Sequence, residues 1–236
     1  MKELTNVDII SINCVNPQAS VAALNHCQKY FKFGKSILVS HIEPSEYYEI
    51  ELHQLEEKLS WDGYNDHILN LKDHTDNDFV MVIQDDGYIV NPELWDDEFL
   101  EYDYIGAPWP IEDNWISMQH KEHQPKLREN LPKNRVGNGG FCIRSRKFLE
   151  FSSQFKDTGI LGEDTFLCTK MYQEAIDYGI KFAPFELAIK FAYENPCFEY
   201  DGHHWDELIT FDSSKHFGWH GNQFANKNEL LSLKYR

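Results

Sequence analysis

A run of apolar residues, Phe79–Ile83, is followed directly by the polar turn Gln84-Asp-Asp-Gly87. The run is too short for a helix and mostly β-favouring, so it predicts a strand buried on both faces. In an open α/β sheet, ligands bind at the carboxyl ends of the strands, where Asp85 and Asp86 fall. Adjacent carboxylates there favour a bound cation such as Mg²⁺ or Mn²⁺. The alternative is an ordinary acidic turn, because Asp-Gly is a common turn dipeptide.

A strand–helix–strand unit precedes this run. Val7–Ile12 is a short β-type stretch, and Pro17–Tyr30 is predicted to be a helix with Asn16 as its N-cap. Ser36–Ser40 is a second short strand. Strand, helix and strand in this order form a βαβ unit, so the sheet is expected to begin parallel and doubly wound.

The rest of the chain adds short elements of both kinds, which predicts an α/β fold with a mostly parallel open sheet flanked by helices. The expected elements are helices over 62–74, 146–155 and 162–178, helical turns over 93–100, and strands over 88–90, 103–110 and 141–143.

One domain is predicted over residues 1–236, because a chain of this length with 42% hydrophobic residues can bury a full core. The polar stretch Ile111–Arg135 has little apolar periodicity. A loop this long inside a compact domain is usually functional, so it is a candidate lid or substrate-binding loop.

Charge and cysteine content restrict the partners and the compartment. The net charge of −17 argues against nucleic acid as a partner. The five cysteines are scattered and never form a C-x-x-C pair, which favours reduced thiols. No apolar run approaches the roughly 20 residues of a membrane helix. A cytoplasmic protein without a transmembrane segment is therefore expected.

Two later segments are candidates for chemistry. The stretch Gly137-Asn-Gly-Gly140 lets the backbone approach another group closely, although a β-bulge needs the same residues. Glu163 and Asp164 open a helix after Gly162, where the helix dipole is expected to lower a carboxylate pKa. Helix capping is the alternative role for this pair. Glu163 points about 100° away from Asp164 around the helix, so the two cannot share one role equally.

In this order along the chain, these features resemble a GT-A-fold glycosyltransferase. More closely, the sequence is similar to a family of uncharacterised domains assigned to the glycosyltransferases. The resemblance extends over roughly Val7 to Gly221. It rests on Ile12-Asn-Cys-Val-Asn-Pro17, Tyr64-Asn65, Val82-Ile-Gln-Asp-Asp-Gly-Tyr-Ile-Val-Asn-Pro92, Tyr102-Asp-Tyr-Ile-Gly-Ala-Pro-Trp109, Val136-Gly-Asn-Gly-Gly-Phe141, Glu163-Asp164 and Phe217-Gly-Trp-His-Gly221.

The resemblance implies a metal site. The Asp-x-Asp metal motif of the GT-A fold falls on Gln84-Asp85-Asp86, so its first carboxylate is a glutamine in this chain. Asp86 matches the second carboxylate, which usually touches the metal. His220 matches a late histidine that supplies a further ligand in many of these enzymes. The implied cofactor is Mn²⁺ or Mg²⁺.

The resemblance also implies the other roles. Asp164 matches the general base of inverting enzymes, and Glu163 beside it is expected to hold the glycine turn or to contact further acceptor hydroxyls. A nucleotide-binding half over about 7–100, an acceptor-binding half over about 101–221 and a C-terminal tail over 222–236 are expected. The residues expected at the nucleotide sugar are Asn13, Cys14, Asn16, Ser40, His41, Tyr64, Gln84, Asp85, Gly139 and Gly140.

The implied activity is metal-assisted, inverting transfer of a sugar from a nucleotide-sugar donor to a hydroxyl of a glycan or glycoconjugate acceptor. A UDP-linked donor is expected because the fold family often uses uridine. A sugar nucleotidyltransferase is one alternative, although Asn13–Pro17 lacks the basic, glycine-rich loop that such enzymes carry after the first strand. A catalytically inactive nucleotide- or glycan-binding domain is the other, suggested by Gln84.

Other conspicuous side chains have simpler interpretations. Trp109 and Trp115 flank the long polar loop, and one of them is a candidate to stack on an acceptor sugar. The adjacent His203 and His204 have no third ligand at a recognisable spacing, which favours a surface or hydrogen-bonding role. The tryptophans expected simply to pack are Trp61, Trp95, Trp205 and Trp219.

Overall fold

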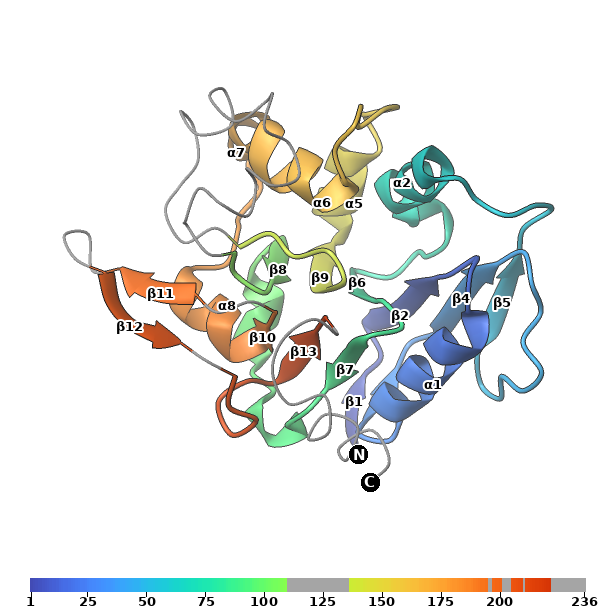
Figure 1. Ribbon diagram of the computed structural model, residues 1–236, viewed down its shortest axis with the longest axis horizontal. Coiled ribbons are helices and arrows are strands. Elements are labelled where there is room, and N and C mark those ends of the chain that lie inside the picture. Colours follow the sequence, from blue (N-terminus) through green and yellow to red (C-terminus); the bar gives the residue numbers. More distant parts are fainter. Residues whose placement is uncertain (110–135, 195–196, 201–204, 210, 222–236) are drawn as a thin grey trace.

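A six-stranded sheet forms the centre of the protein, in the strand order β5-β4-β2-β6-β9-β8 (Figure 1). The computed structural model describes residues 1–109, 136–194, 197–200, 205–209 and 211–221. β2 pairs in parallel with β4 and β6, and β4 with β5, whereas β9 is antiparallel to β6 and β8. The predicted mostly parallel α/β sheet is confirmed. Its strands are β2 (Val7–Ile12), β4 (Ser36–Ser40), β5 (Glu51–Gln54), β6 (Phe79–Ile83), β8 (Tyr104–Gly106) and β9 (Phe141–Ser145).

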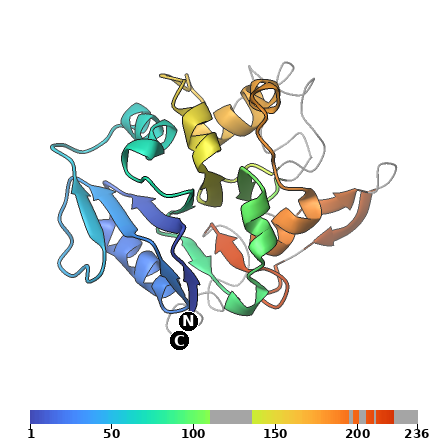
Figure 2. The same ribbon diagram turned by 180° about the vertical axis from the view of Figure 1, so that it is seen from behind.

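The first helix, α1 (Pro17–Gln28), packs on one face of this sheet (Figure 1); seen from behind, the strands β2, β4 and β5 lie in front of it (Figure 2). Asn16 is its N-cap, as predicted, and accepts a hydrogen bond from Ala19 N at 3.3 Å. Val21 and Leu24 are buried against the sheet. The helix ends two residues before the predicted Tyr30, and the chain enters β3 (Phe31–Phe33), which pairs with β1 (Lys2–Leu4).

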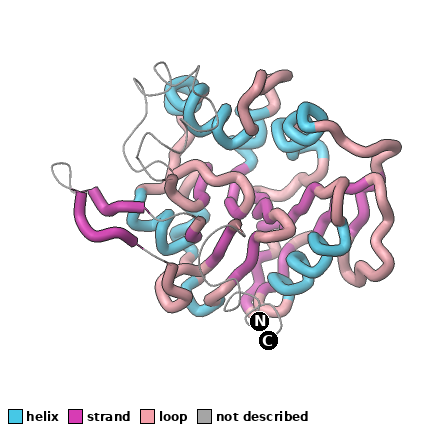
Figure 3. The backbone as a smooth tube through the Cα atoms, in the orientation of Figure 1, coloured by secondary structure: helices cyan, strands magenta, loops and turns pink. Residues whose placement is uncertain are grey.

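The remaining helices lie around the sheet (Figure 3). They are α2 (Trp61–Leu69), α5 (Arg146–Ser152), α6 (Glu163–Thr165), α7 (Tyr172–Tyr178) and α8 (Phe185–Phe191), with 3₁₀ turns at Leu71–Asp73, Pro92–Leu94 and Asp97–Glu101.

Two predicted helices are interrupted. The helix expected over 62–74 ends at Leu69, and a 3₁₀ turn takes up its remainder. The helix expected over 162–178 contains the π-helical segment Phe166–Lys170 between α6 and α7. It ends at Gly179, whose φ of 89° is the left-handed conformation that glycine supplies at a helix C-terminus. π-helical segments occur frequently at functional sites.

A second, three-stranded sheet joins distant parts of the chain in the order β10-β13-β7. Its strands are β10 (Ala192–Tyr193), β13 (Gly218–His220) and β7 (Gly87–Ile89). β7 follows β6 directly, so this sheet is attached to the carboxyl end of the central strand (Figure 1). A separate hairpin is formed by β11 (Cys197–Tyr200) and β12 (Trp205–Ile209). None of the described helices is both long and apolar enough to cross a bilayer.

A chain of three histidines ties β5 to α2 and to the turn before β6. His53 Nδ1 lies 2.9 Å from His74 Nδ1, and His67 Nδ1 lies 3.2 Å from His74 Nε2. At the far end, Glu51 Oε1 is 3.1 Å from His53 Nε2. Each nitrogen pair can share one proton only, so a neutral His74 must donate to one neighbour and accept from the other. Burial and the two neighbouring histidines lower the pKa of His74 to about 4.

We expect this histidine chain to make stability fall in mild acid. The folded-state pKa of His74 lies below its ordinary value of 6.5, so the unfolded state binds more protons between these two pH values. The His74 contribution is therefore complete above about pH 6.5 and lost as the pH falls toward 4. Urea unfolding at pH 7 and pH 5 should show that His74→Gln loses less free energy of unfolding between these two pH values than the wild type does. An equal loss in both proteins would contradict this role.

Candidate active site

The carboxyl end of β6 is the centre of the site. The predicted turn is present, with Gly87 N donating to Gln84 O at 3.0 Å. The same residue, Gln84, donates its backbone N–H to Gly140 O at 2.8 Å, which ties the acidic turn to the glycine turn before β9. The two segments singled out in the sequence therefore lie side by side at one end of the sheet.

The second sheet brings His220 to the acidic turn. β13 runs antiparallel to β7 with His220 opposite Gly87, so its side chain reaches Asp86. His220 Nε2 lies 3.3 Å from Asp86 Oδ1 and 3.0 Å from Gln84 Oε1. Gln84 is oriented by its other side-chain atom, because Nε2 donates to the Tyr64 hydroxyl at 2.8 Å. The two predicted metal ligands are thus neighbours.

Glu194 is a member of this cluster that the sequence did not indicate. β10 pairs in parallel with β13, and Glu194 follows it directly, so its Oε1 lies 3.1 Å from His220 Nδ1. Asn138 Nδ2 lies 2.9 Å from the same nitrogen. Burial disfavours charge on His220, but hydrogen bonds to Asp86 and Glu194 outweigh it and raise its pKa to about 10.

Once His220 gives up its proton, the donor set around its Nε2 fits a divalent cation held partly by substrate. Imidazole, carboxylate and amide oxygen are all acceptable to Mn²⁺. Asp86 Oδ1 and Gln84 Oε1 lie 3.3 and 3.0 Å from Nε2, so a bound cation would be held by one nitrogen and two oxygens. Within the described residues, no group of three or more His, Cys, Asp or Glu side chains is arranged to hold a metal by itself. Such a site would need oxygens from a ligand to complete it.

The glycine turn is shaped by the protein's own side chains. A Cβ on Gly140 would collide with the His220 ring, and one on Gly139 would collide with Glu163 Oε1. Asn138 fixes the turn, because its Oδ1 accepts from Phe141 N at 3.1 Å. The close approach predicted for these glycines is therefore present, and it lets two consecutive residues touch the two sides of the site.

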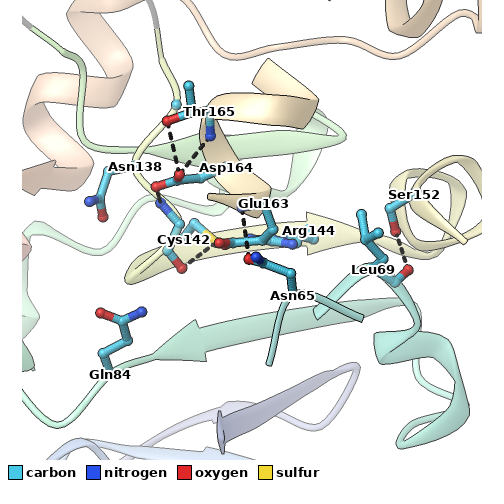
Figure 4. Close-up of polar contacts among 12 residues, drawn as sticks. Asn65, Leu69, Gln84, Asn138, Cys142, Arg144, Ser152, Glu163, Asp164 and Thr165 are labelled. Carbon is cyan, nitrogen blue, oxygen red and sulfur yellow. Dashed lines mark hydrogen bonds and ion pairs between the residues drawn. The ribbon is translucent and has the colours of Figure 1, made fainter. Parts of the chain in front are cut away.

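Asp164 lies across the glycine turn from His220. Its Oδ2 accepts from Gly139 N at 3.1 Å and its Oδ1 from Thr165 N at 2.6 Å (Figure 4). The predicted lowering of its pKa is wrong. Burial, together with the negative charges of Glu163 and Glu194, raises the pKa of Asp164 to about 7, and the two backbone N–H groups offset only part of this shift.

Glu163 points into the protein rather than beside Asp164. It is 5% exposed, and its Oε1 accepts from Arg144 Nη2 at 3.1 Å (Figure 4). Its backbone N–H donates to Asn65 Oδ1 at 3.1 Å. Of the two roles expected for Glu163, this geometry supports holding the glycine turn. Arg144, fully buried on β9, was not predicted, although a charged residue within an apolar strand was a signal for a buried partner.

A cavity of about 490 Å³ opens beside Gln84 and Asp85. It lies between the end of β2, the start of α2 and the acidic turn, and so collects five of the residues predicted to meet the nucleotide sugar. Among the described residues, the lining contains no lysine or arginine. The lining residues are Ile12, Asn13, Cys14, Val15, Leu59, Ser60, Trp61, Tyr64, Gln84 and Asp85.

The other predicted nucleotide-binding residues have different surroundings. Asn16 caps α1, and Ser40 is fully buried, with its Oγ accepting from Ile42 N at 3.1 Å. His41 follows Ser40 and is not among the residues that line the cavity. Asn13 lines the cavity, but its Oδ1 accepts from the backbone of Val15 and Asn16, so it shapes the loop there.

The tryptophans differ from expectation. Trp109, a candidate sugar platform, is 1% exposed and packs in the core, whereas Trp61, expected to pack, is 60% exposed. Trp219 is buried, as expected. Trp115, the loop 111–135, His203 and His204, and the tail 222–236 lie outside the described residues, as does the side chain of Trp205.

A family model described as DUF5672, protein of unknown function, matches residues 49–206, more than half of the chain. The match includes the acidic turn, the glycine turn and Glu163–Asp164. It leaves out the loop after β2 and His220. No curated protein matches the chain.

Solved structures that align with the chain include glycosyltransferases and the bifunctional IspDF from Campylobacter jejuni, the latter with a TM-score of 0.43 at 13% identity, over 80% of this chain and 51% of that one. An active-site mutant of LgtC aligns with a TM-score of 0.54 at 11% identity, over 96% of this chain and 94% of that one. The galactosyltransferase LgtC in complex with donor and acceptor sugar analogues aligns with a TM-score of 0.46 at 12% identity, over 79% of this chain and 75% of that one. A mannosyltransferase from Pyrobaculum calidifontis with GDP-Man and Mn²⁺ aligns with a TM-score of 0.46 at 10% identity, over 78% of this chain and 57% of that one. The likeness to the LgtC mutant shows a GT-A fold.

Proposed function

The chain belongs to the DUF5672 family, and we propose that it is a glycosyltransferase that moves a sugar from a nucleotide-sugar donor to a glycan hydroxyl. One observation carries the proposal. The Asp86–His220 pair and Asp164 contact the acidic and glycine turns at one end of the sheet, beside a cavity of about 490 Å³. A cation-binding pair, a carboxylate and a cavity together supply the parts that sugar transfer needs.

We propose that the donor nucleotide binds in the cavity. Its described lining residues are uncharged apart from Asp85, which suits a base and ribose better than phosphates. The diphosphate would extend toward Asp86 and His220, outside this neutral lining. Asp86, His220 and Gln84 would hold a divalent cation there, and when bound it would neutralise charge on the leaving diphosphate. The net charge of −17 makes such neutralisation important.

Asp164 is the proposed general base. Its carboxylate would accept the proton of the acceptor hydroxyl as that oxygen attacks the anomeric carbon, and direct attack would invert the anomeric centre. Arg144, Glu163 and Asn65 hold Asp164 through the start of α6, so they are positioning residues. The base is most effective when its pKa lies near the working pH, which the raised pKa of Asp164 provides.

The pH dependence of transfer follows from this raised pKa. A base must be deprotonated, so kcat/KM should fall about tenfold per pH unit below about pH 7 and level off above it. An unperturbed aspartate would place that fall near pH 4. Initial rates between pH 5 and pH 8.5 at saturating metal give the profile. A constant rate across this range would contradict the assignment.

The activity itself is tested by nucleoside diphosphate release from a panel of UDP-, GDP- and dTDP-sugars with Mn²⁺, with and without glycan acceptors. We expect release from at least one donor. Asp86→Ala should lower the rate of release at least ~100-fold, the order of effect seen when a group that stabilises charge in the transition state is removed. Undiminished release in excess chelator would remove the cation from the mechanism. Binding of nucleotide sugars with no turnover would favour the inactive binding domain.

A further inference from the structure

Trp61 is a large aromatic side chain left on the surface at the edge of the candidate site. It is the first residue of α2, whose N-cap Ser60 accepts from Gly63 N at 3.1 Å, so its backbone is fixed. Its side chain lines the 490 Å³ cavity and is nevertheless 60% exposed. Burial in the core therefore does not account for a tryptophan at this position.

The indole lies near the candidate base as well as at the cavity. A Cβ placed on Gly162 would lie 3.7 Å from Trp61 Cζ2 and 3.3 Å from Asp164 Oδ1. The six-membered ring of Trp61 and the Asp164 carboxylate therefore both lie within van der Waals distance of the same point beside Gly162. A ligand that reaches Asp164 from this side can rest on the indole.

An aromatic face next to a carboxylate suits a pyranose ring. The C–H groups on one face of a sugar are apolar and weakly positive, and the face of an aromatic ring carries negative charge density. The hydroxyls at the ring edge can donate to a carboxylate such as Asp164. A nucleobase could also stack on an indole, and its N–H groups could donate to the carboxylate, but it has no hydroxyl for Asp164 to deprotonate.

We propose that Trp61 is the platform on which the pyranose ring of the acceptor stacks, with a ring hydroxyl directed at Asp164. The identification of this sugar as the acceptor rests on the proposed function. The contact it describes, a pyranose ring on Trp61, can be measured without turnover. Trp61 thereby contributes to acceptor specificity, because a flat apolar sugar face is required.

Binding is tested by saturation-transfer NMR on the full chain with methyl β-galactopyranoside, methyl α-mannopyranoside and methyl β-glucopyranoside, each at millimolar concentration. We expect transfer to the ring protons of at least one glycoside, and a signal about tenfold weaker in Trp61→Ala, the scale of one aromatic contact. Trp61→Phe should retain most of the signal. Tyr48→Ala is the matched control, since Tyr48 is an exposed aromatic residue that is not among the residues lining the cavity.

Two results would overturn the assignment. One is an equal signal in wild type and Trp61→Ala, or none with any of the three glycosides. The other is loss of UDP or GDP affinity in Trp61→Ala with the urea midpoint unchanged, which would place the nucleobase on the indole. A protein that binds a glycoside through Trp61 but releases no nucleoside diphosphate would refute the transferase and retain the sugar platform.

Discussion

Replacing Asp164 by asparagine is expected to lower kcat by about 10²–10⁴-fold, the usual contribution of a general base. Asparagine has nearly the same shape but cannot accept the acceptor's proton. Donor affinity should change little, because the lost interaction exists mainly in the transition state. One contact complicates the substitution: both carboxylate oxygens of Asp164 accept backbone N–H groups, and an amide can accept only one of them.

A matched control separates catalysis from charge and fold. Asp62 is an exposed carboxylate in the first turn of α2, close to the same cavity, so Asp62→Asn removes one negative charge without touching the glycine turn. It should keep near-normal kcat. Near-normal turnover in Asp164→Asn, or retention of configuration in the product by NMR, would remove Asp164 as the base, and Glu163 would be tested next.

The central strands could be predicted because their signals are local. Phe79–Ile83 is a continuous apolar run bounded by polar residues, and Val7–Ile12 is a short β-type run; the structure buries nearly all of both. The N-cap of α1 and the glycine stop of α7 also depend only on neighbouring residues. Position at the end of β6 then singled out the acidic turn, which lies at the candidate site.

The rest of the site depends on pairing between distant segments. Glu194 meets His220 because β10 pairs with β13, and Asp86 meets it because β7 pairs with β13; no periodicity in the sequence encodes either register. The pKa of Asp164 was predicted with the wrong sign because the helix N-terminus is a local feature, whereas burial and the charge of Glu194 come from the assembled fold. Trp61 was misjudged for the same reason, since exposure is a property of its surroundings.

Arg144→Met is expected to lower the free energy of unfolding by about 3–5 kcal/mol, the cost of leaving a buried charge without its partner. Arg144 is fully buried, and its Nη2 donates to Glu163 Oε1 at 3.1 Å. Its guanidinium also lies 5.5 Å from the ring centroid of Tyr104. Lys156→Met removes an exposed cation just beyond helix α5 and should change stability by no more than about 0.5 kcal/mol.

The double variant Arg144→Met/Glu163→Gln separates loss of packing from loss of charge. If the unpaired carboxylate of Glu163 causes the destabilisation, neutralising it should restore a large part of the stability lost in Arg144→Met, as measured by urea unfolding. A double variant as unstable as the sum of the two single variants would mean that packing dominates. In the restored protein, kcat should still be reduced, because the carboxylate–guanidinium pair beside Gly139 helps to set the position of Asp164. Stability recovered without activity would then identify the Arg144–Glu163 pair as positioning Asp164.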